Sequence, residues 1–155
     1  VYGWIKEETG GADANARMRA ECRAPEVKTV FSAWGSYGWL DQHRRFGTRG
    51  VISERAAYAD FLMSIWSALE AGDAARADDL FAKYLLMMNL SETIPGGHLR
   101  GFNLYVLKRR GLFRNYVSRD YVTPGDTSGK WKLETRVFSP DEIAAIEDRL
   151  SRLAP

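Results

Sequence analysis

A lysine at the end of a short apolar run is the residue of this chain best suited to covalent chemistry. Lys6 follows residues 1–5, VYGWI, which are rich in β-formers and too few for a helix. In a strand, the two-residue alternation places Tyr2, Trp4 and Lys6 on one side, with Lys6 at the carboxyl end. Parallel sheets and barrels build their active sites at that end. A lysine amine held there, near aromatic rings and out of water, can attack a carbonyl carbon and form a Schiff base.

Two carboxylates directly follow this lysine. Glu7 and Glu8 would favour the charged ammonium form of Lys6 if both faced it. A nucleophilic Lys6 therefore requires them to point elsewhere or to bind groups of their own. The alternative interpretation is that Lys6 is a solvated residue at the point where the strand leaves the core.

Other residues able to do chemistry are sparse. The single Cys22 cannot close a disulfide within the chain, and His43 and His98 lack the spacing of a zinc site, so we expect no metal and no other cofactor. The two histidines are expected to be surface or hydrogen-bonded residues. Residues 125–130, GDTSGK, are one residue short of a phosphate-binding loop and follow no strand, which favours a turn.

Charge and hydropathy exclude several classes of partner. Lys and Arg number 22 against 20 Asp and Glu, a net charge of +2, which argues against a nucleic-acid or anionic membrane partner despite the basic runs at residues 44–45 and 108–110. No uncharged stretch approaches the roughly 20 apolar residues of a membrane span. The first residues show no secretion signal, so the sequence predicts a cytoplasmic protein.

The first third of the chain alternates strand and helix signals. Residues 12–23 are good helix formers with an apolar stripe, and residues 28–33 form a second β-type run. Residues 39–46 suit a short helix closed by Gly47, and residues 50–53 suit a third strand, with Ser53 as the N-cap of the next helix. This β-α-β-α-β-α order predicts a parallel sheet or barrel, of which three strands are only a part.

Helix signals dominate from residue 55 onward. Apolar spacing predicts one helix ending at Gly72, a second capped by Asp73, and a third over residues 99–110 that ends before Gly111. We expect a loop over residues 91–97 and an ordered surface loop over residues 119–136. The segment that begins at Ser139 is a capping box with proline at the first helical position, and it starts a final helix.

Four segments together resemble one enzyme family. VYGWIKEETGG is similar to the sixth strand of the dihydrodipicolinate synthase and N-acetylneuraminate lyase family, the pyruvate-type class I aldolases. KTVFSAWGS resembles their seventh strand, FGTRGVIS their eighth, and LEAGDAARADDLF the helical hairpin of their C-terminal region. The segments occur in the family's order, and the resemblance covers essentially all 155 residues. It implies the C-terminal part of a TIM (β/α)8 barrel: three βα units over residues 1–71, then a helical region over residues 72–155.

The resemblance also implies roles for individual residues. Lys6 would be the Schiff-base nucleophile toward a pyruvate-like 2-oxo acid, Ala33 would line the pocket, and Ile52 would pack against the bound keto acid. Trp34 and Gly35 stand where the lysine-biosynthetic synthases tend to have acidic residues, which places that activity in doubt. The KEE segment with this pair is more similar to members that act, as dehydratases or aldolases, on 2-oxo-3-deoxy sugar acids.

The rest of the family's barrel has no counterpart here. Segments resembling strands one to five, with the threonines that hold the substrate carboxylate and the tyrosine that shuttles protons, are missing from the sequence. We therefore expect the chain to be inactive alone and to work with a second chain or an upstream segment that carries those strands. The resemblance implies a homotetramer. The alternative hypothesis is a non-catalytic protein in which residues 55–155 form a helical assembly module.

Overall fold

The fold is known from a computed structural model that describes residues 3–10, 12–33, 37–53, 55–93, 99–122 and 132–152. The chain divides into two compact units, Val1–Ala82 and Lys83–Pro155. The boundary lies within one long helix, α4 (Ala74–Thr93). The predicted division into βα units up to residue 71 and a region after it stays a prediction.

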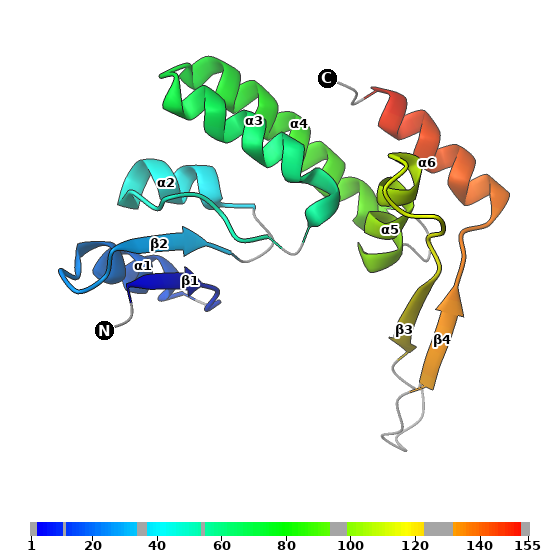
Figure 1. Cartoon of the computed structure of the whole chain (residues 1–155), viewed down its shortest axis with the longest axis horizontal. Helices are drawn as coiled ribbons and strands as arrows, with labels where there is room; N and C mark the ends of the chain where they lie inside the picture. Colours follow the sequence, from blue (N-terminus) through cyan, green and yellow to red (C-terminus); the bar gives the residue numbers. More distant parts are fainter. Residues whose placement is uncertain are drawn as a thin grey trace. The chain divides into compact units, whose positions relative to one another are not determined.

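The first unit contains a small parallel sheet (Figure 1). Strand β1 (Trp4–Glu7) pairs with β2 (Thr29–Ser32) in parallel, with Lys6 opposite Phe31 and Glu7 opposite Ser32. Ser32 in turn makes a parallel bridge to Val51, so the segment around Val51 continues the sheet beyond β2. This confirms an α/β architecture with parallel pairing, whereas the described residues show no closed barrel.

Helices connect the parallel segments. Helix α1 (Ala14–Arg23) links β1 to β2, and α2 (Trp39–Phe46) links β2 to the segment around Val51. The two helices contact each other and both contact β2. Right-handed crossovers between neighbouring parallel strands place their helices on the same face of the sheet, which agrees with that contact. Helix α2 matches the predicted range, and Gly47 ends it in the left-handed conformation with φ 80°.

The third strand is reduced. Residues 50–53 contribute one bridge at Val51 instead of the short strand that the sequence predicts. Gly50 interrupts the strand with φ 120°, a conformation that side chains disfavour. Ser53 is not a helix N-cap: its hydroxyl accepts the Arg55 N–H at 3.1 Å, before a 3-10 turn η2 (Ala56–Tyr58) that leads into α3 (Ala59–Glu70). The first strand also runs two residues further than predicted, to Glu7.

The start of α4 follows its sequence signal. The Asp73 carboxylate accepts the Arg76 backbone N–H at 3.0 Å, as expected of an N-cap, after Gly72 has ended the preceding turn with φ 73°. Its buried face includes Ala77, Tyr84 and Met88, each 0% exposed. The helix continues to Thr93, so residues 91–93 are helical and the predicted loop over residues 91–97 is wrong there. Residues 94–97 lie outside the described part of the chain.

The second unit is not purely helical. It contains α5 (Leu99–Arg109), an antiparallel pair of β3 (Ser118–Val122) and β4 (Lys132–Arg136), and α6 (Pro140–Arg152). The pair corrects the surface loop predicted over residues 119–136 at residues 119–122 and 132–136. Residues 123–131, with the turn predicted over residues 125–130, lie outside the described part of the chain. The capping box is confirmed, because Ser139 N–H donates to Glu142 at 2.8 Å and Glu142 N–H donates back to the Ser139 hydroxyl at 3.2 Å. Among the described residues, no helix is long and apolar enough to cross a membrane.

Candidate functional site at the carboxyl edge of the parallel sheet

Lys6 lies on the face of β1 that also carries Trp4. Alternation along the parallel pair gives Phe31 of β2 the same face, and the Trp4 and Phe31 rings lie 6.1 Å apart. Trp4 is 72% exposed and Lys6 is exposed as well, whereas Glu7, on the opposite face, is 6% exposed. Lys6 therefore stands near the carboxyl end of a parallel strand, on the less covered of its two faces.

The two carboxylates after Lys6 behave differently. The Lys6 Nζ atom lies 2.6 Å from Glu8 Oε2, so Glu8 forms a direct ion pair with the lysine. Both side chains are partly exposed, which limits the strength of this pair. Glu7 points away and binds groups of its own. A nucleophilic Lys6 is expected to require that both carboxylates point elsewhere or bind groups of their own. Glu7 does so, whereas Glu8 pairs with the lysine.

Glu7 fastens the segment that leaves β1. Its Oε1 atom accepts the Thr9 backbone N–H at 2.7 Å and also accepts the Thr9 hydroxyl. The Arg17 side chain of α1 then reaches the same segment, with Nε 2.9 Å from Thr9 Oγ1 and an N–H group donated to the Gly10 carbonyl at 3.2 Å. These bonds hold residues 7–10 against α1 and so fix where the carboxyl end of β1, with Lys6, leaves the sheet.

A second carboxyl group, Glu21 of α1, lies against Glu7. Burial and the negative charge of Glu7 raise the pKa of Glu21 above its ordinary value of 4.5. Burial also acts to raise the pKa of Glu7, but hydrogen bonds from Thr9 and Glu21 and the charge of Arg17 hold it below that value. The two carboxyl groups thus share one hydrogen bond, in which Glu21 is the group that keeps its proton longer.

Two of the other predicted site residues, Ala33 and Ile52, follow the neighbouring segments at the same edge of the sheet. Ala33 follows the last residue of β2 and is 5% exposed, and Ile52 follows Val51 and is 43% exposed. Since all three segments are parallel, their carboxyl ends gather at one edge. Trp34 lies outside the described residues. Ala33 lines a pocket of about 150 Å³ together with Glu7, Thr9, Met18 and Gln42; its lining includes neither Lys6 nor Ile52.

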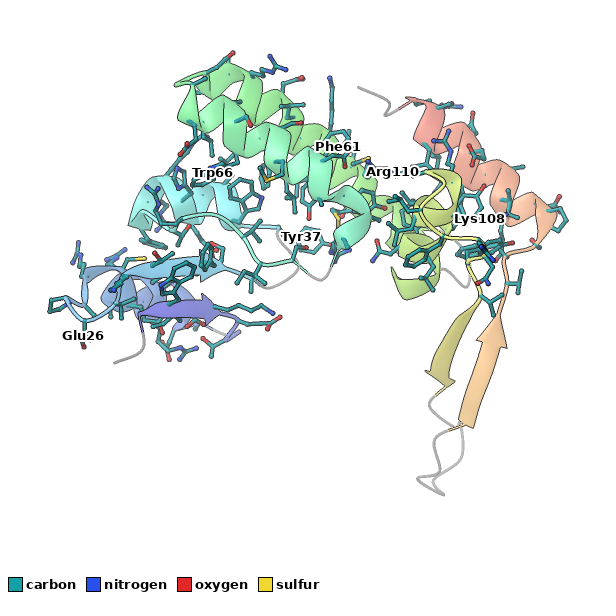
Figure 2. All side chains as sticks on the ribbon, in the orientation of Figure 1. Glu26, Tyr37, Phe61, Trp66, Lys108 and Arg110 are labelled. Carbon is teal, nitrogen blue, oxygen red and sulfur yellow. The ribbon has the colours of Figure 1, made fainter. Side chains whose placement is uncertain are left out.

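Sequence reasoning missed a buried arginine after the third parallel segment. Arg55 comes shortly after the segment around Val51 and is 5% exposed. Its guanidinium carbon lies 5.3 Å from the centre of the Tyr37 ring, and Tyr37, labelled in Figure 2, comes shortly after β2. The signal available in the sequence was weak, because a single arginine before an alanine-rich helix is ordinary. Its burial depends on how the loops fold.

Cys22 and His43 are structural in this arrangement. Burial and the charge of Glu21 raise the pKa of the Cys22 thiol, which opposes a reactive thiolate. The Nδ1 atom of His43 is hydrogen-bonded to the Thr48 carbonyl, and its ring lies edge-on to Trp66 at 5.2 Å. This confirms the expectation of a hydrogen-bonded histidine. In the part of the chain that the structure describes, no three His, Cys, Asp or Glu side chains are grouped to hold a metal ion.

Comparison with known proteins adds no relative. No family model, no curated protein and no solved structure matches the chain. The resemblance of the four sequence segments and the arrangement around Lys6 are therefore the basis for a functional proposal.

Proposed function

We propose that the chain supplies the Schiff-base lysine of a lyase that acts on a pyruvate-like 2-oxo acid, with Lys6 as the nucleophile. The observation that carries the proposal is the position of Lys6: a lysine near the carboxyl end of a parallel strand, on the face opposite the buried Glu7 and beside the carboxylate of Glu8. Carboxyl ends of parallel strands are where such enzymes place reacting groups.

The step requires a neutral amine and a proton acceptor. Glu8 Oε2, 2.6 Å from Nζ, first takes a proton from the Lys6 ammonium group, and the neutral amine attacks the keto carbon. Glu8 gives that proton to the former carbonyl oxygen, takes a second proton from the nitrogen and gives it to the resulting hydroxyl group, which leaves as water. The products are a protonated imine and the Glu8 carboxylate. The imine then accepts the electron pair released when a carbon–carbon bond breaks in an aldolase, or stabilises the carbanion from which a hydroxyl group leaves in a dehydratase. Glu8 therefore changes from an ion-pair partner to a proton carrier in this scheme.

The substrate class follows from the resemblance and from one further residue. The KEE segment and residues 34–35 favour a 2-oxo-3-deoxy sugar acid, which carries a carboxylate next to the keto group. Arg55, in the segment that follows Val51, is buried, and a guanidinium is well suited to bind a carboxylate. We assign Arg55 to the substrate carboxylate, Ala33 to the pocket wall and Ile52 to contact with the keto acid.

The complete site needs more strands than the described residues provide. The exposure of Trp4 at 72% and Ile52 at 43% agrees with a sheet that continues into further βα units, supplied by an upstream segment or a second chain. Closing those units with β1 and the Val51 segment would give a (β/α)8 barrel, and four such barrels would give the tetramer that the resemblance implies. The chain alone is expected to show no turnover.

Borohydride trapping tests the nucleophile. The chain, with any polypeptide that copurifies with it, is incubated with pyruvate and sodium borohydride, and its peptides are analysed by mass spectrometry. The reduced three-carbon adduct should appear at Lys6 and disappear in Lys6→Arg. Lys28→Arg is the matched control and should leave the adduct unchanged, because Lys28 is an exposed lysine beside Gly3, the residue before β1. An adduct spread equally over both lysines, or absent from Lys6, overturns the proposal.

A second function is favoured by the compactness of residues 83–155. That unit has its own buried residues, Phe102 and Ile146, and a fastened final helix. If the helical segment is instead a non-catalytic assembly module, a chain without residues 1–53 stays folded by circular dichroism and elutes as a defined oligomer. If it is part of a barrel, that truncated chain aggregates.

A further inference from the structure

A pocket separate from the lysine lies beside Trp66 in the first unit. It has a volume of about 250 Å³ and is lined by Phe31 of β2 and by residues of α2, α3 and the segment around Val51. We call it the Trp66 pocket and define it by Trp39, Arg49, Gly50, Leu62, Met63 and Trp66. Drug-sized ligands occupy pockets of roughly 300 to 1,000 Å³, so this one suits a molecule with a single ring.

The position of the Trp66 ring is fixed by its neighbours. Its centre lies 6.5 Å from the Trp39 ring and 5.2 Å from the His43 ring, and both of these residues belong to α2. Figure 2 shows Trp66 on α3 with its side chain on the side toward α2. Gly50 packs beside the ring, since a Cβ atom built at this glycine would lie at van der Waals distance, 3.9 Å, from the indole. The indole is therefore a rigid wall for a planar ligand.

Arg49 adds a positive charge to this wall. Its guanidinium carbon lies 5.9 Å from the centre of the Trp66 ring, and the side chain is exposed. Among the described residues, no carboxylate forms an ion pair with Arg49, in contrast to Arg44 and Arg45, which pair with Asp78 and Asp41. A guanidinium over an aromatic ring can still direct the N–H groups of its edge toward a carboxylate, which binds such an edge with two parallel hydrogen bonds.

The remaining lining is apolar. Met63 is 61% exposed and Leu62 is half-buried, so both present apolar surface to a molecule in the pocket. Thioether sulfur atoms make favourable contacts with aromatic rings. The lining thus combines an apolar surface with one cationic side chain. This combination is complementary to an aromatic ring that carries one carboxylate.

We propose that the Trp66 pocket binds a small planar monocarboxylate with a single ring. The ring lies against Trp66 and Met63, and the carboxylate pairs with Arg49. The proposal is independent of the Schiff-base chemistry, because the pocket contains neither Lys6 nor its ion-pair partner Glu8. Such a ligand would be an effector or a second binding group, not the 2-oxo acid itself.

Benzoate is the probe that tests the site, with benzamide as its uncharged counterpart. Tryptophan fluorescence and the indole N–H signals in a nuclear magnetic resonance spectrum follow a titration of each compound into the chain. Benzoate should bind saturably with a Kd in the millimolar range, shift the Trp66 signal, and bind about tenfold more tightly than benzamide, because a hydrogen-bonded charge pair distinguishes the two.

Two variants of Arg49 test whether benzoate binding depends on this side chain or only on positive charge in general. Arg49→Gln should weaken benzoate binding about tenfold, and Arg49→Lys, which keeps the charge without the paired donors, should weaken it less. Arg19→Gln is the matched control: Arg19 is also exposed and lies 5.3 Å from an aromatic ring, that of Phe46, but does not line the pocket. Equal binding of benzamide, no saturable binding, or equal weakening by Arg19→Gln overturns the proposal.

Discussion

The two compact units use their polar groups differently. In residues 83–155, the Tyr105 hydroxyl donates to Glu147 at 2.6 Å and the Arg109 Nε atom lies 2.8 Å from the same carboxylate, so these bonds fasten α5 to α6. In residues 1–82, Glu7 is 6% exposed and lies against a second carboxyl group, Glu21. Both units pair opposite charges at their surfaces, but the first unit also keeps two acids together near the end of a strand.

The bonds among Tyr105, Arg109 and Glu147 hold two helices together, whereas Glu7 and Glu21 lie where they can position the segment beside Lys6. Burial and the bond to Glu147 raise the pKa of Tyr105 to about 12, so that the phenol stays protonated and keeps donating throughout the neutral range. The Glu7 and Glu21 pair, by contrast, has one lowered and one raised pKa, and Glu7 holds the segment next to Lys6. Variants in each unit test whether this contrast is correct, and we take them from the largest expected effect to the smallest.

Truncation of the core of the second unit should have the largest effect. Phe102 of α5 is 0% exposed, so Phe102→Ala should lower the free energy of unfolding by about 3 to 5 kcal/mol, as expected when a buried phenyl ring leaves a cavity. Urea unfolding followed by circular dichroism measures the loss. Leu112→Ala, at a site 64% exposed, is the control and should change it by less than about 0.5 kcal/mol. Similar losses in both variants would show that this unit has no core of its own.

Removing the phenol of the second unit should have a smaller, pH-dependent effect. Tyr105→Phe should lower the free energy of unfolding by about 1 kcal/mol at pH 7, since Glu147 loses one donor. Burial acts to raise the pKa of Glu147, but the bonds from Tyr105 and Arg109 hold it below 4.5. The stabilisation is therefore present above pH 4.5 and is lost as the pH falls through the lowered pKa. Urea unfolding at pH 7 and pH 3 measures this; an equal loss at both would contradict the network.

The stabilisation that comes from the Glu7 and Glu21 pair should depend on pH in the opposite direction. Glu21 has a raised pKa, so its contribution to stability is present below pH 4.5 and is lost as the pH rises through its pKa in the folded chain. Glu21→Gln keeps a donor toward Glu7 at every pH and removes that loss. As the pH rises from about 4 to about 8, the free energy of unfolding of this variant should therefore rise relative to that of the wild type by on the order of 1 kcal/mol. A constant difference across this range would show that the two acids do not share a proton.

Replacing the exposed tryptophan should have the smallest effect. Trp4 is 72% exposed, so Trp4→Ser should change the free energy of unfolding by less than about 0.5 kcal/mol. Trp39→Ser, at a site 1% exposed, is the control and should cost several times more. Thermal unfolding of both variants measures the difference. A large loss at Trp4 would mean that the face of β1 carrying Lys6 is already covered.

Local signals in the sequence predict much of this fold. The glycine after residue 46, the aspartate at position 73 and the capping box at Ser139 each act through bonds to residues a few positions away, and the structure contains all three features. The parallel pairing of β1 and β2 is also confirmed, because alternation of strand and helix leaves few other arrangements.

Features that depend on distant parts of the chain were not predictable. Strands β3 and β4 pair across a long connection, and their sequences lack the strict alternation or the short turn that marks a hairpin. The Glu7 and Glu21 pair depends on how α1 returns along the sheet. The two residues are 14 positions apart in the sequence, and that spacing does not predict that their carboxyl groups meet. The roles of Lys6, Ala33, Trp34 and Ile52 stay predictions.

The continuity of α4 has a consequence for how the protein is degraded. The boundary between the units falls inside this helix of 20 residues, well past its first turn, where backbone N–H groups bond to carbonyls four positions earlier. Proteases cut extended, accessible chain, and a helix must unwind locally before it fits their clefts. Limited proteolysis should therefore spare the boundary, and the two units should be released from one another only after α4 has opened.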